Sequence, residues 1–187
     1  SYVNPKAVSS SKSIIETARS QTAKMIDAEP SEIFFTGSGT ESNNIVIWSV
    51  LHQKNKHVIT SCIEHPAVLK VLEELTAFGL TYDILPVDST GLINPSDLKS
   101  AIKKDTGLIS IMYVNNEVGT IQKFDKLTEI AKEHSIPFHS DCVQSLGKIP
   151  ISTKDLKIDY MSFSAHKFYG PKGIGFLFKR NGVPIKP

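Results

Sequence analysis

The sequence predicts an α/β fold in which helices cover both faces of a mostly parallel sheet, giving three layers. Two observations carry this prediction. Short apolar runs alternate with amphipathic segments along the chain, as in repeated strand–helix–strand units. The composition is that of a globular protein, since 40% of the 187 residues are hydrophobic and 21% are charged. This length is enough for one sizeable domain with a buried core.

The first elements follow from capping residues and periodicity. A predicted helix over 9–26 begins with serines that can cap it. One face of this helix would carry Ile14, Ile15, Ala18, Thr22 and Met25. The run EIFFT over 32–36 is interpreted as a short buried strand, and a helix is predicted over 42–52.

The alternation continues to the end of the chain. VITSC over 58–62 is a predicted strand. Pro66 suits the first position of the next helix, PAVLKVLEELTAF, and Gly79 ends it. The remaining predicted elements are strand 80–85, helix 96–104, strand 108–114, helix 124–134 and strands 136–140, 158–163 and 174–178.

Charge and composition argue against several classes of function. The net charge is +2 and the basic residues are scattered among acidic ones, so we expect no nucleic-acid partner. No apolar run approaches the roughly 18 residues that cross a bilayer, so we expect no membrane partner. The two cysteines lack metal-type spacing, which favours free thiols in a reducing compartment and no metal site. Because the chain opens on Ser1 without a methionine, we expect a piece of a longer protein.

Parallel sheets bind ligands at the carboxyl ends of their strands, so the residues after each strand are the site candidates. After the first strand, residues 37–42 read GSGTES. Gly37 and Gly39, the hydroxyls of Thr40 and Ser42 and a following helix N-terminus make an anion cradle that suits a phosphate. The segment is neither a P-loop nor a GxGxxG motif. A tight turn with ordinary helix capping is the alternative interpretation.

Two further strand ends carry polar candidates. His65 precedes a proline and could stack on a flat ring or transfer protons; the alternative is a capping or surface histidine. Asn116 follows the strand over 108–114 and could hydrogen-bond a ligand; the alternative is a turn, which Asn favours.

Asp141 follows the strand over 136–140, with Gln144 three residues later. A carboxylate at a buried strand end needs a partner, which could be a salt bridge or a protonated heterocyclic nitrogen. His139 is interpreted as a packed strand residue. Cys142 is interpreted as a small buried hydrophobic residue and not as a reactive thiol.

The strand over 158–163 leads into Ser164, His166 and Lys167. Lysines are usually solvated, which is the alternative for Lys167 taken alone. Together, however, a phosphate-type cradle, a ring-stacking histidine, an isolated acid and a lysine match one cofactor. Pyridoxal phosphate has a phosphate, a flat ring, a pyridinium nitrogen that needs a carboxylate, and an aldehyde that forms a Schiff base with lysine.

Five blocks carry a family resemblance: FFTGSGTESNN, TSCIEHPAVL, IMYVNNEVGTIQ, FHSDCVQSLGKIPI and MSFSAHKFYGPKGIG. They resemble the signature segments of cysteine desulfurases of the NifS/IscS type, which are class V, fold-type I pyridoxal-phosphate enzymes. The blocks occur in the family's order, and the likeness covers nearly the whole chain. GPKGIG favours the NifS/IscS branch over the SufS/selenocysteine-lyase branch.

The resemblance implies that residues 1–187 are a partial pyridoxal-phosphate-binding large domain, without the family's N-terminal segment and C-terminal small domain. It implies that Lys167 forms the Schiff base, that His65 stacks over the ring and relays protons, and that Asp141 pairs with the ring nitrogen. Gln144 and Asn116 would contact the phenolic oxygen of the ring and the substrate region. The phosphate ligands implied by the resemblance are Gly39, Thr40, Ser164 and His166.

The family converts L-cysteine to L-alanine and passes sulfur, as a persulfide, to an acceptor for iron–sulfur cluster assembly or tRNA thiolation. Its nucleophilic cysteine lies well downstream of the lysine, and neither Cys62 nor Cys142 occupies that position. Cys142 also replaces the usual alanine after the family's aspartate. We therefore expect the parent protein to be a desulfurase and the isolated chain to be inactive.

The resemblance further implies a homodimer, an acceptor protein such as an iron–sulfur scaffold, and a cytoplasmic location, or a mitochondrial one in a eukaryote. Two alternatives stay open. One is another class V enzyme, an aminotransferase or a selenocysteine lyase, against which NNEVGT and EHPAVL argue. The other is a non-catalytic module that binds pyridoxal phosphate or only a partner protein.

Overall fold

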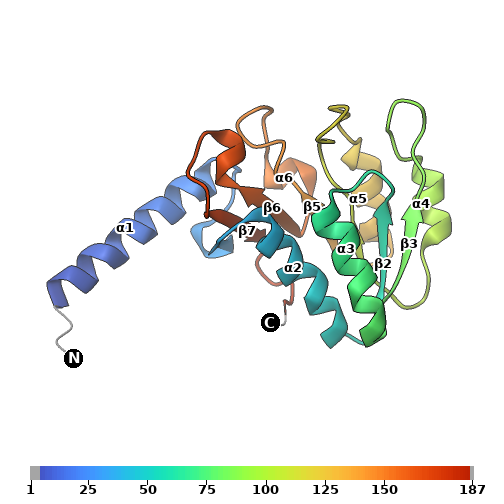
Figure 1. Cartoon of the computed structure of the whole chain (residues 1–187), viewed down its shortest axis with the longest axis horizontal. Helices are drawn as coiled ribbons and strands as arrows, with labels where there is room; N and C mark the ends of the chain where they lie inside the picture. Colours follow the sequence, from blue (N-terminus) through green and yellow to red (C-terminus); the bar gives the residue numbers. More distant parts are fainter. Residues whose placement is uncertain (1–4, 186–187) are drawn as a thin grey trace.

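The computed structural model describes residues 5–185, with side chains from residue 11 onward. Its centre is a seven-stranded sheet in the order β1-β7-β6-β5-β4-β2-β3 (Figure 1). The strands are β1 (Ile33–Thr36), β2 (His57–Ser61), β3 (Thr81–Leu85), β4 (Thr106–Ser110), β5 (Phe138–Asp141), β6 (Tyr160–Ser164) and β7 (Gly175–Lys179). The helices are α1 (Pro5–Lys24), α2 (Gly39–Ser49), α3 (Pro66–Leu75), α4 (Pro95–Ala101), α5 (Phe124–Glu133) and α6 (Thr153–Leu156).

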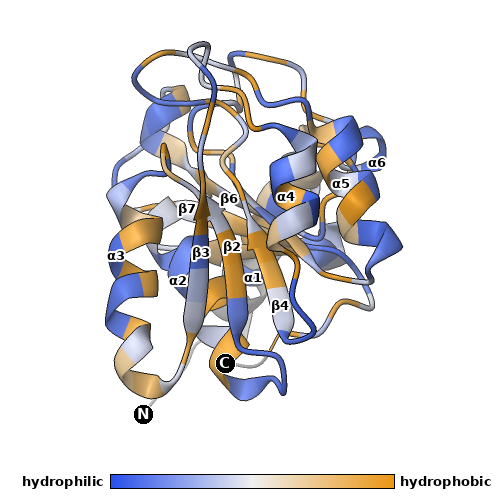
Figure 2. Cartoon of the chain, turned by 90° about the vertical axis from the view of Figure 1, so that its right-hand side faces the viewer, coloured by the Kyte–Doolittle hydropathy of each residue, from blue (hydrophilic) through white to orange (hydrophobic). Residues whose placement is uncertain are grey.

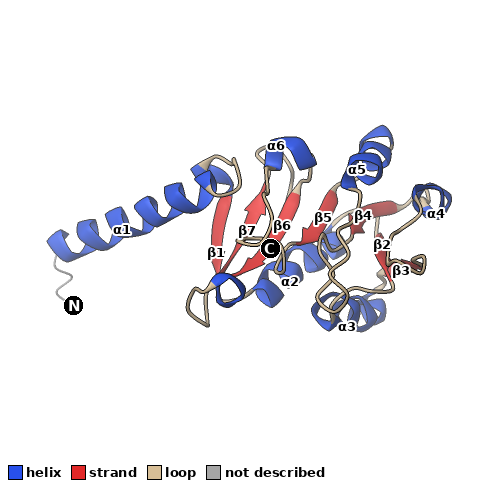
Figure 3. Ribbon diagram, turned by 90° about the horizontal axis from the view of Figure 1, so that it is seen from above, coloured by secondary structure: helices blue, strands red, loops and turns tan. Residues whose placement is uncertain are grey.

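Helices α2 and α3 cover one face of the sheet, and α4, α5 and α6 cover the other (Figure 3). The predicted three-layer α/β architecture is therefore confirmed. Within residues 5–185, no helix is both long and apolar enough to cross a membrane.

Strand direction decides where a ligand site can form. The neighbours from β6 through β5, β4 and β2 to β3 pair in parallel. Strand β7 runs antiparallel to both β1 and β6, so β1 points the same way as the parallel strands. Six strands consequently bring their carboxyl ends to one edge of the sheet, where α/β proteins bind ligands.

Alternate residues of the central strands β2 and β4 enter two separate hydrophobic cores. On β2, Val58 packs beneath α2 and α3, while Ile59 packs on the opposite face. Leu108 and Ile109 divide in the same way on β4, because successive side chains of a strand point to opposite faces. Burial on both faces explains the continuous apolar runs in the sequence, and Figure 2 shows hydrophobic residues along β2 and β4.

Most predicted elements are confirmed, with boundaries shifted by a few residues. Pro66 is the first residue of α3, and a short 3-10 turn continues it to Gly79, which has a left-handed φ of 86°. The helix predicted over 42–52 begins earlier, at Gly39, and its last turn is 3-10. Helix α6 was not predicted, because its 4 residues are too few to show a period.

The strand predicted over 108–114 is wrong after residue 110. The amides of Ile111 and Tyr113 still donate to β5, at the carbonyls of His139 and Asp141. On the other side, however, β2 has already ended, and the amide of Met112 donates to the Glu64 carboxyl group over 2.9 Å. The segment therefore leaves the sheet while still following β5.

The first strand and helix are less buried than predicted. On β1 only Ile33 is buried, while Phe34 and Phe35 are 43% and 39% exposed, because β1 is an edge strand. The Arg19 guanidinium lies 5.1 Å from the Phe35 ring centroid and covers part of it. Helix α1 extends away from the sheet (Figure 1).

The apolar face predicted for α1 is therefore not a core face. Ile14 and Met25 are 67% and 50% exposed, and Ile15 is also exposed. The contacts with the core come instead from the end of the segment, where Ala23 and Ile26 are buried.

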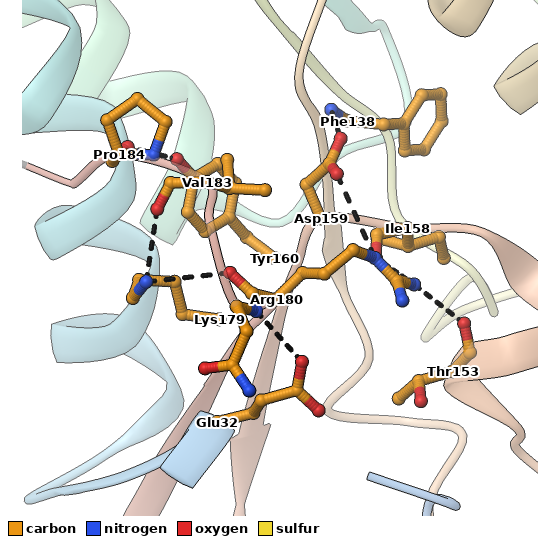
Figure 4. Close-up of polar contacts among 11 residues, drawn as sticks. Glu32, Phe138, Thr153, Ile158, Asp159, Tyr160, Lys179, Arg180, Val183 and Pro184 are labelled. Atoms are coloured by element: carbon orange, nitrogen blue, oxygen red, sulfur yellow. Dashed lines mark hydrogen bonds and ion pairs between the residues drawn. The ribbon is translucent and has the colours of Figure 1, made fainter. Parts of the chain in front are cut away.

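A polar network around Arg180, just after β7, lies at the amino ends of the parallel strands, away from the carboxyl ends where ligands bind (Figure 4). The Arg180 guanidinium donates to the carbonyls of Thr153 and Ile158, each over 2.7 Å. Asp159 accepts from the Phe138 amide over 2.8 Å and lies 3.9 Å from Arg180. These contacts join the end of β7 to the starts of β5 and β6.

Candidate functional site

A cavity of about 250 Å³ lies at the carboxyl ends of the strands. Segments that follow β1, β2, β4, β5 and β6 contribute to its wall. Its lining includes every site residue predicted from the sequence, namely Gly39, Thr40, His65, Asn116, Asp141, Gln144, Ser164, His166 and Lys167. Five further residues line it: Ser38, Asn43, Ala67, Met112 and Val143.

The anion cradle is the N-terminus of α2. Ser38 is its N-cap, and the serine hydroxyl accepts the amide hydrogen of Glu41 over 3.1 Å. The helix is 11 residues long, so its free amides and dipole favour a negative group at this end. Ordinary capping, one of the two interpretations weighed from the sequence, is present, and the anion cradle stays a prediction.

The glycine at position 39 has a packing reason. A Cβ added to Gly39 would lie 2.5 Å from Val143 Cγ2 and 3.4 Å from Ser164 Cβ. The start of α2 therefore lies directly against the ends of β5 and β6. This close approach brings the helix N-terminus beside Ser164, whose hydroxyl lies 3.0 Å from His166 Nδ1.

Asp141 lies on the cavity wall and is only 6% exposed. Its Oδ1 accepts from the Val143 amide over 3.0 Å, and its Oδ2 accepts from the Asn43 side chain over 2.8 Å. Burial raises the pKa of Asp141, and these two hydrogen bonds oppose that rise. A buried carboxylate of this kind is stabilised by a cationic group placed in the cavity.

Asn43 is a site residue that the sequence reasoning missed. It is 1% exposed, and its Oδ1 has no hydrogen-bond partner among the described residues. Four residues after Gly39, it lies about one helical turn further along α2, so one helix holds both the cradle and the Asp141 partner. That spacing in GTESNN was the available signal.

His65 caps α3 and also lines the cavity. Its Nδ1 accepts the amide hydrogen of Ala67 over 3.0 Å, so this nitrogen carries no proton in that arrangement. The Nε2 atom is then the protonated nitrogen of the neutral ring. Capping, which was the alternative interpretation, fixes the ring that faces the cavity.

Two asparagines follow β4, Asn115 and Asn116, and they lie in different surroundings. Asn115 forms the turn, because its Oδ1 accepts from the amides of Glu117 and Val118 over 3.0 and 2.9 Å. Asn116 is exposed and lines the cavity. The turn thus presents its second asparagine to a ligand.

Lys167 and Gln144 supply the remaining donors. Lys167 lies in a 3-10 turn, Ala165–Phe168, directly after β6. Its side chain is exposed to the cavity, and no hydrogen bond or ion pair holds its amine within the described part of the chain. The Lys148 amine donates to Gln144 Oε1, which leaves the Gln144 Nε2 group free to donate.

His139 and Cys142 lie outside the cavity, as predicted. His139 is fully buried between Ser110 and Ser162, with ring-to-hydroxyl distances of 2.8 and 3.0 Å, and burial lowers its pKa to about 3. Burial raises the pKa of the Cys142 thiol to about 12. Both groups are neutral near pH 7 and support the sheet beneath Asp141.

Residues 4–186 match the family model described as aminotransferase class V. The chain belongs to the class-V aminotransferase family. Members of this family and its cysteine desulfurases are pyridoxal-phosphate enzymes, which confirms the fold-type I prediction.

Two curated relatives of this class-V chain are named cysteine desulfurase IscS. This chain is 52% identical over 176 residues to the cysteine desulfurase IscS of Dictyoglomus turgidum, and the match covers 92% of this chain and 45% of the relative. It is 47% identical to the cysteine desulfurase IscS of Methanosarcina thermophila, covering 100% and 48%. The solved structure of SspA in complex with cysteine superposes with a TM-score of 0.92 at 39% identity, covering 100% and 55%. The chain thus spans about half the length of these relatives.

The cavity of this class-V domain fits pyridoxal phosphate. The N-terminus of α2 suits the phosphate and the buried Asp141 carboxylate suits a protonated ring nitrogen. Lys167 offers to the aldehyde an amine that has no partner among the described residues. The fit rests on the chemistry of these groups and on their place around one cavity.

Proposed function

We propose that this chain is the cofactor-binding large domain, residues 1–187, of a cysteine desulfurase. The whole protein would convert L-cysteine to L-alanine and pass the sulfur, as a persulfide, to an acceptor protein such as an iron–sulfur scaffold or a tRNA-thiolation partner. One observation carries the proposal: five segments from separate strand ends converge on one cavity with the donor set that pyridoxal phosphate requires. The IscS relatives, and the cysteine complex of SspA, support the substrate.

Each side chain then has a role. Lys167 would hold the cofactor covalently through its amine and would move the substrate α-proton. Asp141 would accept a hydrogen bond from the ring nitrogen and keep it protonated. The bound cofactor supplies an electron sink for the bonds around the substrate α-carbon. His65 would lie over the ring, with its Nε2–H available as a donor.

The polar rim orients the cofactor at its two ends. The Gln144 Nε2 group and Asn116 would donate to the phenolic oxygen and reach the substrate region. At the other end, the amides of α2 would hold the phosphate. The residues assigned to the phosphate are Gly39, Thr40, Ser164 and His166.

The persulfide step needs a nucleophile that the described cysteines do not provide. Cys142 is fully buried and burial raises the pKa of its thiol to about 12, which leaves almost no thiolate near pH 7. Cys62 is exposed but does not line the cavity. We therefore propose that this chain alone binds the cofactor without releasing sulfide.

We also propose, from the resemblance to the family, that the whole protein acts as a cytoplasmic or mitochondrial homodimer.

The experiment mixes the chain with pyridoxal phosphate, reduces it with borohydride and maps the adduct by mass spectrometry. The expected adduct is on Lys167, and a Lys167→Arg variant should remain unlabelled. A label on another lysine would contradict the assignment. A parallel assay of alanine and sulfide from cysteine should be negative for the chain and positive for the full-length protein; turnover by the chain would mean that the nucleophile has been misplaced.

A further inference from the structure

Glu64 is a buried acid that no step above uses. It lies in the loop between β2 and α3, immediately before His65, and is 5% exposed. Its Oε1 accepts from the Ser61 hydroxyl over 2.5 Å and from the Met112 amide over 2.9 Å. Glu64 does not line the cavity, although Met112 and His65 do.

These two bonds tie two cavity loops together. Ser61 is the last residue of β2, and Met112 lies just after β4, four residues before Asn116. A second contact runs the same way, since the Asn115 side chain donates to the Ile63 carbonyl over 3.0 Å. The loop that carries His65 is thus held against the loop that carries Asn116.

The second carboxyl oxygen of Glu64 explains why the contact between the two loops depends on the protonation of this residue. Glu64 Oε2 is buried and has no hydrogen-bond partner among the described residues. An ionised carboxylate would leave that oxygen uncompensated, whereas a protonated group leaves only a weaker polar atom there. One titratable group bears on it, Asp141 from the end of β5, and its negative charge also opposes ionisation of Glu64.

The pKa of Glu64 agrees with this geometry. Burial, with a smaller contribution from the negative charge of Asp141, raises it to about 8, against the opposing hydrogen bonds of Ser61 and Met112. The carboxyl group is therefore neutral at pH 7 and ionises in mildly alkaline solution.

We propose that Glu64 is a positioning residue: its neutral carboxyl group clamps the His65 loop to the Asn116 loop and so sets the position of His65 in the cavity. The role of His65 itself rests on the proposed function. The clamp does not, because it is a property of the chain without any ligand.

The test compares wild type with Glu64→Ala and Glu64→Gln, using Glu73→Gln on the exposed side of α3 as a matched control. Amide hydrogen exchange is measured without cofactor, as protection factors over 61–68 and 111–118. Glu64→Ala should lose about 10- to 100-fold of protection in both loops, since two buried donors lose their acceptor. Glu64→Gln keeps an oxygen for both donors and cannot ionise, so its protection at pH 7 should equal or exceed that of wild type, and Glu73→Gln should match wild type.

A pH series distinguishes the clamp from general destabilisation. Protection of the two loops in wild type should fall relative to Glu64→Gln as the pH rises from about 5 to 8, because the opened loop ionises Glu64 near its usual pKa of 4.5 and the closed loop only near 8. Parallel curves for these two proteins would overturn the proposal. So would unchanged protection in Glu64→Ala; if that variant does not fold, the pH series decides alone.

Pyridoxal phosphate titration of the same proteins separates the clamp from the proposed function. Wild type should bind the cofactor at pH 7, and Glu64→Gln should bind it equally well. A wild-type chain that binds none would contradict the proposed function while leaving the exchange result standing. If wild type binds the cofactor normally but Glu64→Ala leaves the protection of both loops unchanged, the clamp is contradicted and the proposed function is not.

Discussion

The side-chain amide of Asn43 donates to Asp141 Oδ2 over 2.8 Å, and both side chains are buried. The bond reaches from α2 to the end of β5, across 98 residues of sequence. It fixes the carboxylate that faces the cavity and leaves the other Asp141 oxygen to the Val143 amide.

Asn43→Ala should weaken pyridoxal phosphate binding by about tenfold or more, because hydrogen bonds to charged groups contribute roughly 1.5–3 kcal/mol. The measurement is an absorbance titration of the cofactor. Asn44→Ala is the matched control, since within the described residues the Asn44 side chain donates only to the Thr40 carbonyl on the same helix and does not line the cavity. Equal affinity in the two variants would show that Asn43 does not support Asp141.

Gly39→Ala should destabilise the chain by about 1–3 kcal/mol, as expected for overpacking of a tight contact. Its Cβ would lie 2.5 Å from Val143 Cγ2, so the start of α2 must move away from the sheet. Gly37→Ala is the control, because there the added atom meets the flexible end of Glu41 at 3.1 Å. Urea unfolding of Gly39→Ala with Val143→Ala should recover most of the loss; no recovery would place the strain elsewhere.

His139 should make the folded state less stable in acid. Burial lowers its pKa from 6.5 to about 3, so the unfolded chain binds a proton there that the folded chain does not. Stability from this group is complete above pH 6.5 and falls by about 1.4 kcal/mol per pH unit as the pH drops towards 3. Replacing His139 with Gln should remove that slope in urea unfolding between pH 4 and pH 7, and an unchanged slope would assign it to other groups.

Glu64 should act with the opposite sign. Its pKa is raised from 4.5 to about 8, so the folded chain retains a proton that the unfolded chain has lost. Stability from this group is complete below pH 4.5 and falls by about 1.4 kcal/mol per pH unit as the pH rises towards 8. Between pH 6.5 and pH 8 the difference in unfolding free energy between Glu64→Gln and wild type should therefore grow with pH. A constant difference would mean that Glu64 is already ionised in the folded chain.

The site could be predicted from the sequence because its residues follow strands. Once the apolar runs were assigned to a parallel sheet, Asp141, Ser164 and Lys167 had to meet at one edge. Asn43 did not follow from this rule, because it lies inside a helix and reaches the site through the packing of α2. Glu64 was missed for a related reason: its partners, Ser61 and Met112, come together only when β2 and β4 pair.

The boundary errors have a similar origin. The apolar run IMYV looks like a continuing strand, but nothing in the sequence shows that its neighbour β2 has ended at Ser61. The burial predicted for Phe34 and Phe35 failed because local hydrophobicity does not tell an edge strand from a central one.

Helix α2 also sets the separation of two parts of the site, because it carries both Gly39 and Asn43. Gly39 sits at its first residue and Asn43 four residues on, so a rise of about 1.5 Å per residue sets an axial offset of roughly 6 Å between the anion end and the Asp141 end. Because Gly39 and Asn43 belong to one helix, their separation is set by the helix and not by a loop. Movement of α2 would therefore shift the helix N-terminus and the amide that holds Asp141 together.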